Sequence, residues 1–233
     1  MILHCVGNDI IDLTTRHARE KISDTRFIER VLTATEQCLL ECHNETAVLL
    51  LWSFWAAKET GYKVIRKQYG NVTSAPRRYD VRLDRVPDIT EHHTQVVGGV
   101  VETPHSPVFI TITARHDFIH CIGISGEASF LDMVIAGIGT AADRPSPRAD
   151  SKTARDLARH HLSLFLNHDL SAIDIIRTKD IRGLAPPEVL IAKERSTIDL
   201  SLSHDGNFAA YAFFQRDHGG SNKPQTAHHA GQG

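Results

Sequence analysis

No apolar run in this chain of 233 residues is long enough to cross a membrane. The longest comprises residues 47–52 and, after Ser53, residues 54–57, and it ends at Lys58. A membrane-spanning helix needs about 20 predominantly apolar residues in succession. The first residues also lack the charged segment and the small-residue cleavage site of a secretory signal. We therefore expect a cytoplasmic protein with no membrane partner.

Cysteine is scarce, and neither sign of charge prevails. The four cysteines are irregularly spaced, and a reducing compartment keeps such residues as free thiols. The formal net charge is −2, so the chain as a whole carries no positive field that would attract nucleic acid. With 41% hydrophobic and 23% charged residues, the composition is that of an ordinary folded protein, whose length allows one large core or two small ones.

The first half of the chain, residues 1–128, has the pattern of helices followed by strands. A break in the first helical segment is expected at Thr33, because Thr33 and Glu36 have the spacing of a capping box. Gly61 is the one unfavourable residue in the strongest helical segment. The expected elements are a strand at 2–12, helices at 24–41 and 45–67, and strands at 81–83, 95–101 and within 108–124.

The second half, residues 129–216, repeats this order. Residues 108–117 and 198–205 resemble each other, and each segment is followed by a second apolar strand. We therefore predict an α+β protein that arose by internal duplication. Residues 217–233 are rich in Gly, His and Gln and are expected to form a disordered tail. The expected elements are a strand at 130–138, a Pro-rich joint at 141–150, a helix at 151–167, and strands at 173–178, 188–192, 197–203 and 208–214.

The first motif with chemical potential is Gly7-Asn8-Asp9, on the expected first strand. A glycine permits a tight turn of the backbone, and an aspartate carboxylate is a good ligand for a hard cation. Taken alone, the motif is equally compatible with a solvated aspartate at the end of a strand.

The second motif is the helical segment 55–63, which contains Lys58, Glu59 and Lys63. Glu59 and Lys63 are four residues apart on one helix face, so a surface ion pair is the simplest interpretation. However, Glu59 follows a strongly apolar stretch, which places its carboxylate at the border of the core. A carboxylate there needs a cation or a basic side chain as its partner.

The third motif, Ser201-Leu202-Ser203-His204, leaves a strand and is followed by Gly206, which permits a turn. Serine and histidine side chains at such a place can donate hydrogen bonds to a phosphate. A hydrolase triad is rejected, because the members of a triad come from separated segments of the chain.

Two further motifs do not carry a site. The segment 137–142 matches the spacing of a dinucleotide-binding loop, but Pro145 and Pro147 prevent the helix that would have to follow it. Cys38 and Cys42 share a helix face, yet no second cluster completes the four ligands of structural zinc.

Together and in this order, the three motifs resemble those of the 4'-phosphopantetheinyl transferase superfamily. The hallmarks of that family are G-x-D on an early strand, W/F-x-x-K-E-x-x-x-K on a helix, and S-x-S-H. Residues 26–36 are also similar to the R-F-x-x-R-V-L-T-x-x-E stretch of its holo-acyl-carrier-protein synthase branch. The resemblance spans residues 6–214 with gaps.

This resemblance implies a pseudo-twofold tandem of two transferase-like halves that acts as a monomer, a pseudodimer. Residues 1–128 would supply the metal-binding and catalytic motifs, and residues 129–216 the motif that binds the phosphates of coenzyme A. In many double-length members the histidine motif precedes the acidic one, whereas here the order is reversed.

The reaction implied is the transfer of 4'-phosphopantetheine from coenzyme A to a serine of an apo acyl or peptidyl carrier protein. Adenosine 3',5'-bisphosphate is the other product. Fatty acid, polyketide, nonribosomal peptide and polyunsaturated lipid synthesis all stay open as the pathway served. By resemblance, Asp9 and Glu59 hold Mg²⁺, with Mn²⁺ as an alternative. Glu59 accepts the proton of the carrier serine, and Lys63 offsets charge on the pyrophosphate.

Four further side chains are expected at the coenzyme. Lys58 lies near its phosphates, Ser203 and His204 bind the phosphates of its nucleotide, and Arg182 replaces the lysine of the family's G-K-P motif. Arg26 and Arg30 are candidates for contact with an acidic carrier helix, with an ordinary solvated helix face as the alternative.

The chain departs from the family pattern at Ile11, where many double-length members carry a third acidic residue. Asp12 follows it directly and should face the other way along a strand. Two other interpretations of the function stay open: a binding protein without turnover, and a metal-dependent phosphohydrolase. A phosphohydrolase usually needs more carboxylates and histidines in metal-ligand spacing than this sequence contains.

Overall fold

The computed structural model describes residues 4–88, 93–140, 151–180 and 183–216. They form a mixed fold of helices and two five-stranded antiparallel sheets, as predicted for the α+β class. A short pair of strands, β8 (Lys179–Asp180) and β9 (Gly183–Leu184), forms a third sheet that the sequence did not predict. The Pro-rich joint at 141–150 and the tail at 217–233 lie outside the described residues.

The first half contains the predicted order of helices and strands. Short 3₁₀ turns join several of the helices. The elements are β1 (Val6–Asp12), α1 (Arg16–Glu20), α2 (Thr25–Val31), α3 (Ala34–Cys42), α4 (Ala47–Tyr69), β2 (Asp80–Leu83), β3 (Gln95–Glu102), β4 (Val108–Ala114) and β5 (Phe118–Ser125).

The predicted break between two helices is confirmed at Thr33, the N-cap of α3. The Thr33 hydroxyl accepts a hydrogen bond from the Glu36 amide at 3.4 Å, and the Glu36 carboxylate accepts one from the Thr33 amide at 2.8 Å. This reciprocal pair is a capping box. The side chain of Asp24 caps α2 in a similar way, through the Phe27 amide.

Two glycines bring α4 close to the first sheet. A Cβ atom on Gly61 would lie 3.1 Å from Val101, and one on Gly7 would lie 2.5 Å from the Thr60 carbonyl oxygen. Gly7 was expected to permit a tight turn, but it lies within β1. Its function there is to leave room for the helix, because any side chain would collide with the backbone of α4.

The second half begins with a correction to the predicted elements. The strand expected at 130–138 starts only at Ile135, because residues 128–133 form a 3₁₀ turn. Gly206, with φ of +52°, makes the turn between β11 and β12, as predicted. The elements are β6 (Ile135–Thr140), α5 (Ser151–Leu166), β7 (Ile173–Ile176), β10 (Glu188–Ile191), β11 (Glu194–Asp205) and β12 (Phe208–Gln215).

The two large sheets have the same strand order. The first is β1-β5-β4-β3-β2, and the second is β6-β12-β11-β10-β7. In each sheet the first strand of the half pairs with the last, and the long helix lies between the first and second strands in sequence. The helix α4 packs on the first sheet and α5 on the second, each over its own hydrophobic core.

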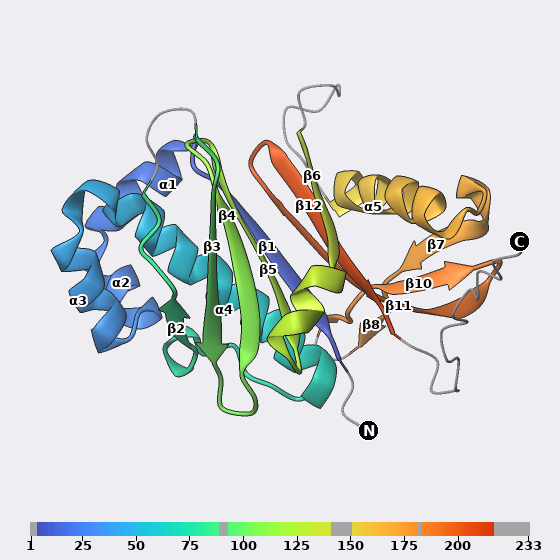
Figure 1. Cartoon of the computed structure of the whole chain (residues 1–233), viewed down its shortest axis with the longest axis horizontal. Coiled ribbons are helices and arrows are strands. Elements are labelled where there is room, and N and C mark those ends of the chain that lie inside the picture. Colours follow the sequence, from blue (N-terminus) through green and yellow to red (C-terminus); the bar gives the residue numbers. More distant parts are fainter. Residues whose placement is uncertain (1–3, 89–92, 141–150, 181–182, 217–233) are drawn as a thin grey trace, which may run out of the picture.

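The two sheets meet along β1, β11 and β12 (Figure 1). Helices α1–α4 lie at one end of the molecule and α5 at the other. Two small apolar clusters join the halves, one around Val6 and Phe214 and one around Ile10 and Phe208. None of the helices in the described residues is long and apolar enough to cross a membrane.

Candidate active site

The free edge of β1 is covered by side chains of β11. Val6 donates its amide to Asp199 Oδ2 at 2.6 Å, and Asn8 donates its amide to Ser201 Oγ at 3.0 Å. Further along, the Asp12 amide donates to Asp205 at 2.9 Å. Alternate residues of β11 thus satisfy the backbone donors that an edge strand leaves unpaired.

Two lysines of α4 satisfy the carbonyls of the same edge. Lys63 Nζ donates to the Asn8 carbonyl at 2.7 Å, and Lys67 Nζ donates to the Val6 carbonyl at 2.7 Å. Lys67 also reaches the second half, where it donates to the Leu200 carbonyl at 2.7 Å and to Asp199 Oδ2 at 2.9 Å. The first catalytic motif, the helix motif and the second half are therefore held together at one place.

Three of the predicted catalytic residues lie side by side here. Lys63 Nζ is 2.8 Å from Asp9 Oδ1, and both side chains are largely buried. Burial raises the pKa of Asp9, an effect that the ammonium of Lys63 opposes. Burial, and after it the charge of Asp9, also raises the pKa of Glu59. The charge of Asp9 therefore acts on the Glu59 carboxylate.

The cleft beside these residues is lined by both halves of the chain. From α4 it takes one face of the helix, on which basic side chains follow Glu59. From the second half it takes Arg177, which follows β7, together with residues of β9, of the loop after β9 and of β11. The lining residues are Glu59, Tyr62, Lys63, Arg66, Lys67, Arg177, Leu184, Pro186, Pro187, Ser201 and Leu202.

The third motif is only partly at the cleft. Ser201 lines it, whereas Ser203 is buried and accepts a hydrogen bond from Asn8 Nδ2 at 2.8 Å. Asn8 Nδ2 also lies 3.2 Å from Nε2 of the buried His120. Burial lowers the pKa of His120 to about 3, so its ring is neutral at physiological pH. His204 is exposed.

Lys58 is not part of this group of residues. Its Nζ is 2.8 Å from Glu36 Oε2 in a fully buried ion pair, and it donates to the carbonyls of Pro76 and Tyr79. Burial lowers the pKa of Lys58, and Glu36 opposes that shift. With its donors satisfied inside the first core, Lys58 does not reach the cleft. The family resemblance implied that Lys58 lies near the phosphates of the coenzyme together with Glu59, but neighbours on a helix point about 100° apart.

The other predicted residues lie elsewhere. Arg182 lies outside the described residues. Arg26 and Arg30 are exposed on α2. Ile11 is buried in the first core, and Asp12 faces the turn after β11, where it accepts a hydrogen bond from the Asn207 amide at 2.8 Å. Asp12, which directly follows Ile11 at the usual third acidic position, therefore contacts the second half through its carboxylate.

The donor set of the site fits a hard divalent cation. Asp9 and Glu59 are two oxygen ligands whose pKa values are both raised by burial, and a cation between them would relieve their mutual repulsion. In the described part of the chain, no group of three His, Cys, Asp or Glu side chains is placed to hold a metal. Two protein carboxylates suffice for Mg²⁺, which usually keeps several waters or substrate phosphates as ligands.

Sequence reasoning did not single out Arg66 and Lys67, and it assigned a role to Ser203 and His204 of the third motif but none to Ser201. The two basic residues follow Glu59 and Lys63 at helical spacing, so a search along that face of α4 would have found them. No comparable local signal marks Arg177, because the fold alone brings it to the cleft.

Comparison with known proteins identifies one family. Residues 5–102 match the family model described as ACPS, the 4'-phosphopantetheinyl transferase superfamily. This range contains the first two motifs. No curated protein and no solved structure matches the chain.

Proposed function

Since residues 5–102 carry a domain of the 4'-phosphopantetheinyl transferase superfamily, we propose that this chain is a holo-acyl-carrier-protein synthase-type enzyme. It transfers 4'-phosphopantetheine from coenzyme A to a serine of an apo acyl or peptidyl carrier protein and releases adenosine 3',5'-bisphosphate. The observation that carries the proposal is that Glu59 and Lys63 line a cleft rich in basic side chains, with Asp9 paired to Lys63 beside it.

The proposed reaction is one displacement at phosphorus. The serine oxygen of the carrier forms a bond to the phosphorus that bears the pantetheine arm, and the bond from that phosphorus to the bridging pyrophosphate oxygen breaks. The bridging oxygen leaves on adenosine 3',5'-bisphosphate with the electron pair, and the serine proton passes to Glu59. A pKa raised by burial brings this carboxylate closer to the range of an effective general base.

Lys63 and Asp9 prepare the position of the pyrophosphate. Lys63 is fixed between the Asn8 carbonyl and Asp9, so its ammonium is already oriented when the substrate arrives. A preoriented cation stabilises negative charge that builds up on the leaving oxygen. When bound between Asp9 and Glu59, Mg²⁺ would supply further charge neutralisation of the phosphates.

The two halves are proposed to be a pseudo-twofold tandem that acts as a monomer. In support, their sheets have the same strand order, and one cleft takes residues from both halves. The first half supplies Asp9, Glu59 and Lys63, while the second supplies Ser201 and Arg177. The positions of Ser203 and His204 favour a smaller role at the phosphates than their motif implies. The carrier is proposed to contact Arg26 and Arg30.

Intact-mass spectrometry tests the proposal. Purified apo carrier proteins from fatty acid, polyketide and peptide synthesis are incubated with the protein, coenzyme A and Mg²⁺. We expect one carrier to gain the mass of one phosphopantetheine group, with loss of the gain in EDTA and with Glu59→Gln. Glu102→Gln, which changes a partly buried glutamate on β3, is the matched control and should retain the gain.

Two further measurements on the same proteins and ligands distinguish the other functions. A binding protein would hold coenzyme A or a carrier in calorimetry without any gain in mass. A phosphohydrolase would release phosphate from coenzyme A in the absence of a carrier. Either result would contradict the proposed transfer.

A further inference from the structure

The basic residues of the cleft fall into two pairs with different partners. Lys63 and Lys67 each form an ion pair with a buried carboxylate, Asp9 and Asp199 respectively. Arg66 and Arg177 line the same cleft, but within the described ranges neither guanidinium forms an ion pair with a carboxylate. The uncompensated positive charge of the cleft is therefore concentrated on these two arginines.

Backbone carbonyls hold the two arginines beside each other. Arg66 donates to the Leu184 carbonyl at 3.1 Å, and Arg177 donates from Nε to the Ala185 carbonyl at 3.1 Å. These carbonyls belong to consecutive residues, so side chains from α4 and from the loop after β7 converge on one short segment. In both arginines, other N–H donors of the guanidinium stay available to a ligand.

Placing two like charges together in a partly buried cleft has a cost. Burial, then the charges of Arg155 and Arg66, lowers the pKa of Arg177, so its surroundings disfavour the charged form. Arginine nevertheless stays protonated in proteins. An anion bound between the guanidiniums would remove this repulsion, and the planar, many-donor guanidinium suits a phosphate.

We infer that Arg66 and Arg177 form a second anion subsite, which binds the 3'-phosphate monoester of coenzyme A and distinguishes it from the form that lacks this phosphate. The inference rests on the proposed function. It moves recognition of the 3'-phosphate from Ser203 and His204 to the arginine pair, because Ser203 is buried and bonded to Asn8.

The position of Arg66 along α4, relative to Lys63, agrees with the chemistry of the ligand. Arg66 follows Lys63 by three residues, or about 4.5 Å along the helix axis. In coenzyme A one ribose carries the pyrophosphate at its 5'-oxygen and the phosphate monoester at its 3'-oxygen. Two anionic groups on one sugar therefore match two adjacent cationic positions of the cleft, Lys63 and, further along α4, Arg66 with Arg177 of the second half beside it.

Calorimetry with coenzyme A and with dephospho-coenzyme A tests the inference. The wild-type protein should bind coenzyme A about 10-fold to 100-fold more tightly, the usual range for losing a charged hydrogen-bonded group. In the double variant Arg66→Met/Arg177→Met this ratio should fall to about 1, while the affinity for dephospho-coenzyme A stays unchanged. Arg177→Lys should retain part of the preference because it keeps the charge.

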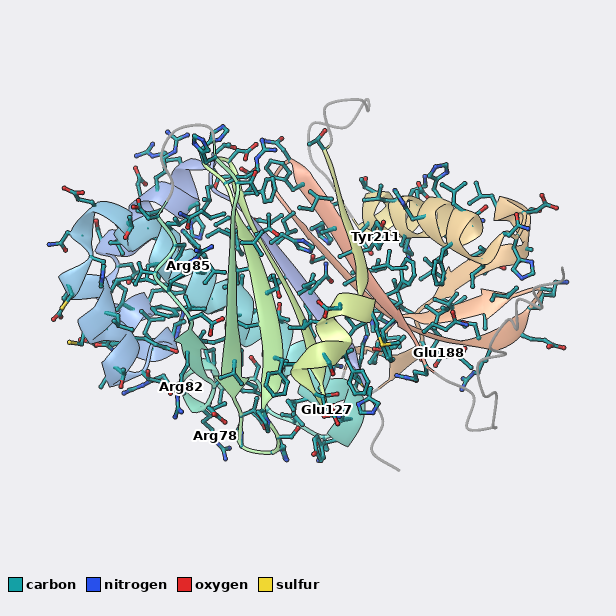
Figure 2. The ribbon with its side chains drawn as sticks, in the orientation of Figure 1. Arg78, Arg82, Arg85, Glu127, Glu188 and Tyr211 are labelled. Atoms are coloured by element: carbon teal, nitrogen blue, oxygen red, sulfur yellow. The ribbon has the colours of Figure 1, made fainter. Side chains whose placement is uncertain are left out.

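Arg85→Met is the matched control. Arg85 also donates to a backbone carbonyl, that of Val96 at 2.6 Å, but it is exposed after β2 in the first half (Figure 2). This variant should keep the wild-type ratio. Thermal unfolding of each variant shows whether the substitution has destabilised the fold.

Two results would overturn the inference while leaving the transferase proposal intact. One is a wild-type protein that transfers phosphopantetheine but binds both ligands equally. The other is a double variant that loses affinity for both ligands to the same extent, which would assign the arginines a purely structural role. If the wild-type protein neither binds coenzyme A nor modifies a carrier, the proposed function fails, and this inference fails with it.

Discussion

Lys67 on α4 and Asp199 on β11 form a buried ion pair that joins the two halves of the molecule, with Nζ and Oδ2 2.9 Å apart. Each partner also binds the edge of β1, Lys67 through the Val6 carbonyl and Asp199 through the Val6 amide. Arg216 adds a second cation, 2.7 Å from Asp199 Oδ1. The pair thus holds β1, α4 and the second sheet in one arrangement.

Lys67→Met should destabilise the protein strongly. The substitution leaves Asp199 with Arg216, whose side chain is 30% exposed, as its remaining cation among the described residues, and it removes the Lys67 donor from the carbonyls of Val6 and Leu200. Breaking one side of a buried pair typically costs about 3–5 kcal/mol. Denaturant unfolding measures this change in the free energy of unfolding. Arg16→Met, at the exposed pair with Glu20, is the control and should cost less than about 1 kcal/mol. Equal effects of the two variants would contradict a structural role for Lys67.

Lys58→Met should lower stability without weakening binding of coenzyme A. Its loss leaves the Glu36 carboxylate buried without its cation, although the amides of Thr33 and Val81 still donate to it. The free energy of unfolding should fall by about 3 kcal/mol. Calorimetry at low temperature, where the variant remains folded, should give the wild-type affinity. A selective loss of affinity at unchanged stability would instead place Lys58 at the phosphates, as its motif predicts.

Stability should decrease with acidification below pH 6.5 because of His120. Its pKa is lowered to about 3 in the folded protein, against about 6.5 when unfolded. Between these values the unfolded state binds the extra proton, so acidification favours unfolding by up to about 1.4 kcal/mol per pH unit. The stability present above pH 6.5 is lost as the pH falls toward the folded pKa.

His120→Gln should remove this part of the pH dependence. Denaturant unfolding at pH 7.5, 6.5 and 5.5 gives the slope for each protein. His116→Gln, which changes an exposed histidine in the turn before β5, should retain the wild-type slope. If His120→Gln and the wild type have the same slope, the ring is not held neutral by the fold.

Glu59→Gln should reduce the transfer rate by about 10²-fold to 10⁴-fold, the usual contribution of a general base. Since burial raises the pKa of Glu59 above the ordinary value for a glutamate, the rate of the wild type should fall on acidification at a pH above that ordinary value. The variant should lack this acidic limb in the pH profile of kcat/KM. An unchanged profile in the variant would assign the proton transfer to another group.

Much of the local structure was predictable because it depends on residues close together in the chain. The capping box of Thr33 and Glu36 predicted where one helix ends and the next begins, and α4 follows the expected range with Gly61 inside it. By contrast, the 3₁₀ turn before β6 was predicted as strand. Its apolar residues have the composition of a strand, and contacts with the neighbouring sheet decide their conformation.

The sequence by itself determined which residues of the first half we propose for the chemistry and in which elements they lie. Asp9, Glu59 and Lys63 are recognisable because their motifs are short and sit on one strand and one helix. Only the tertiary structure decided which way other side chains face. It turned Lys58 toward Glu36, placed Ser201 rather than Ser203 in the cleft, and brought Arg177 beside Arg66. The physical reason is that these positions depend on partners far away in the chain, whose burial and charge are fixed only when the two sheets pack together.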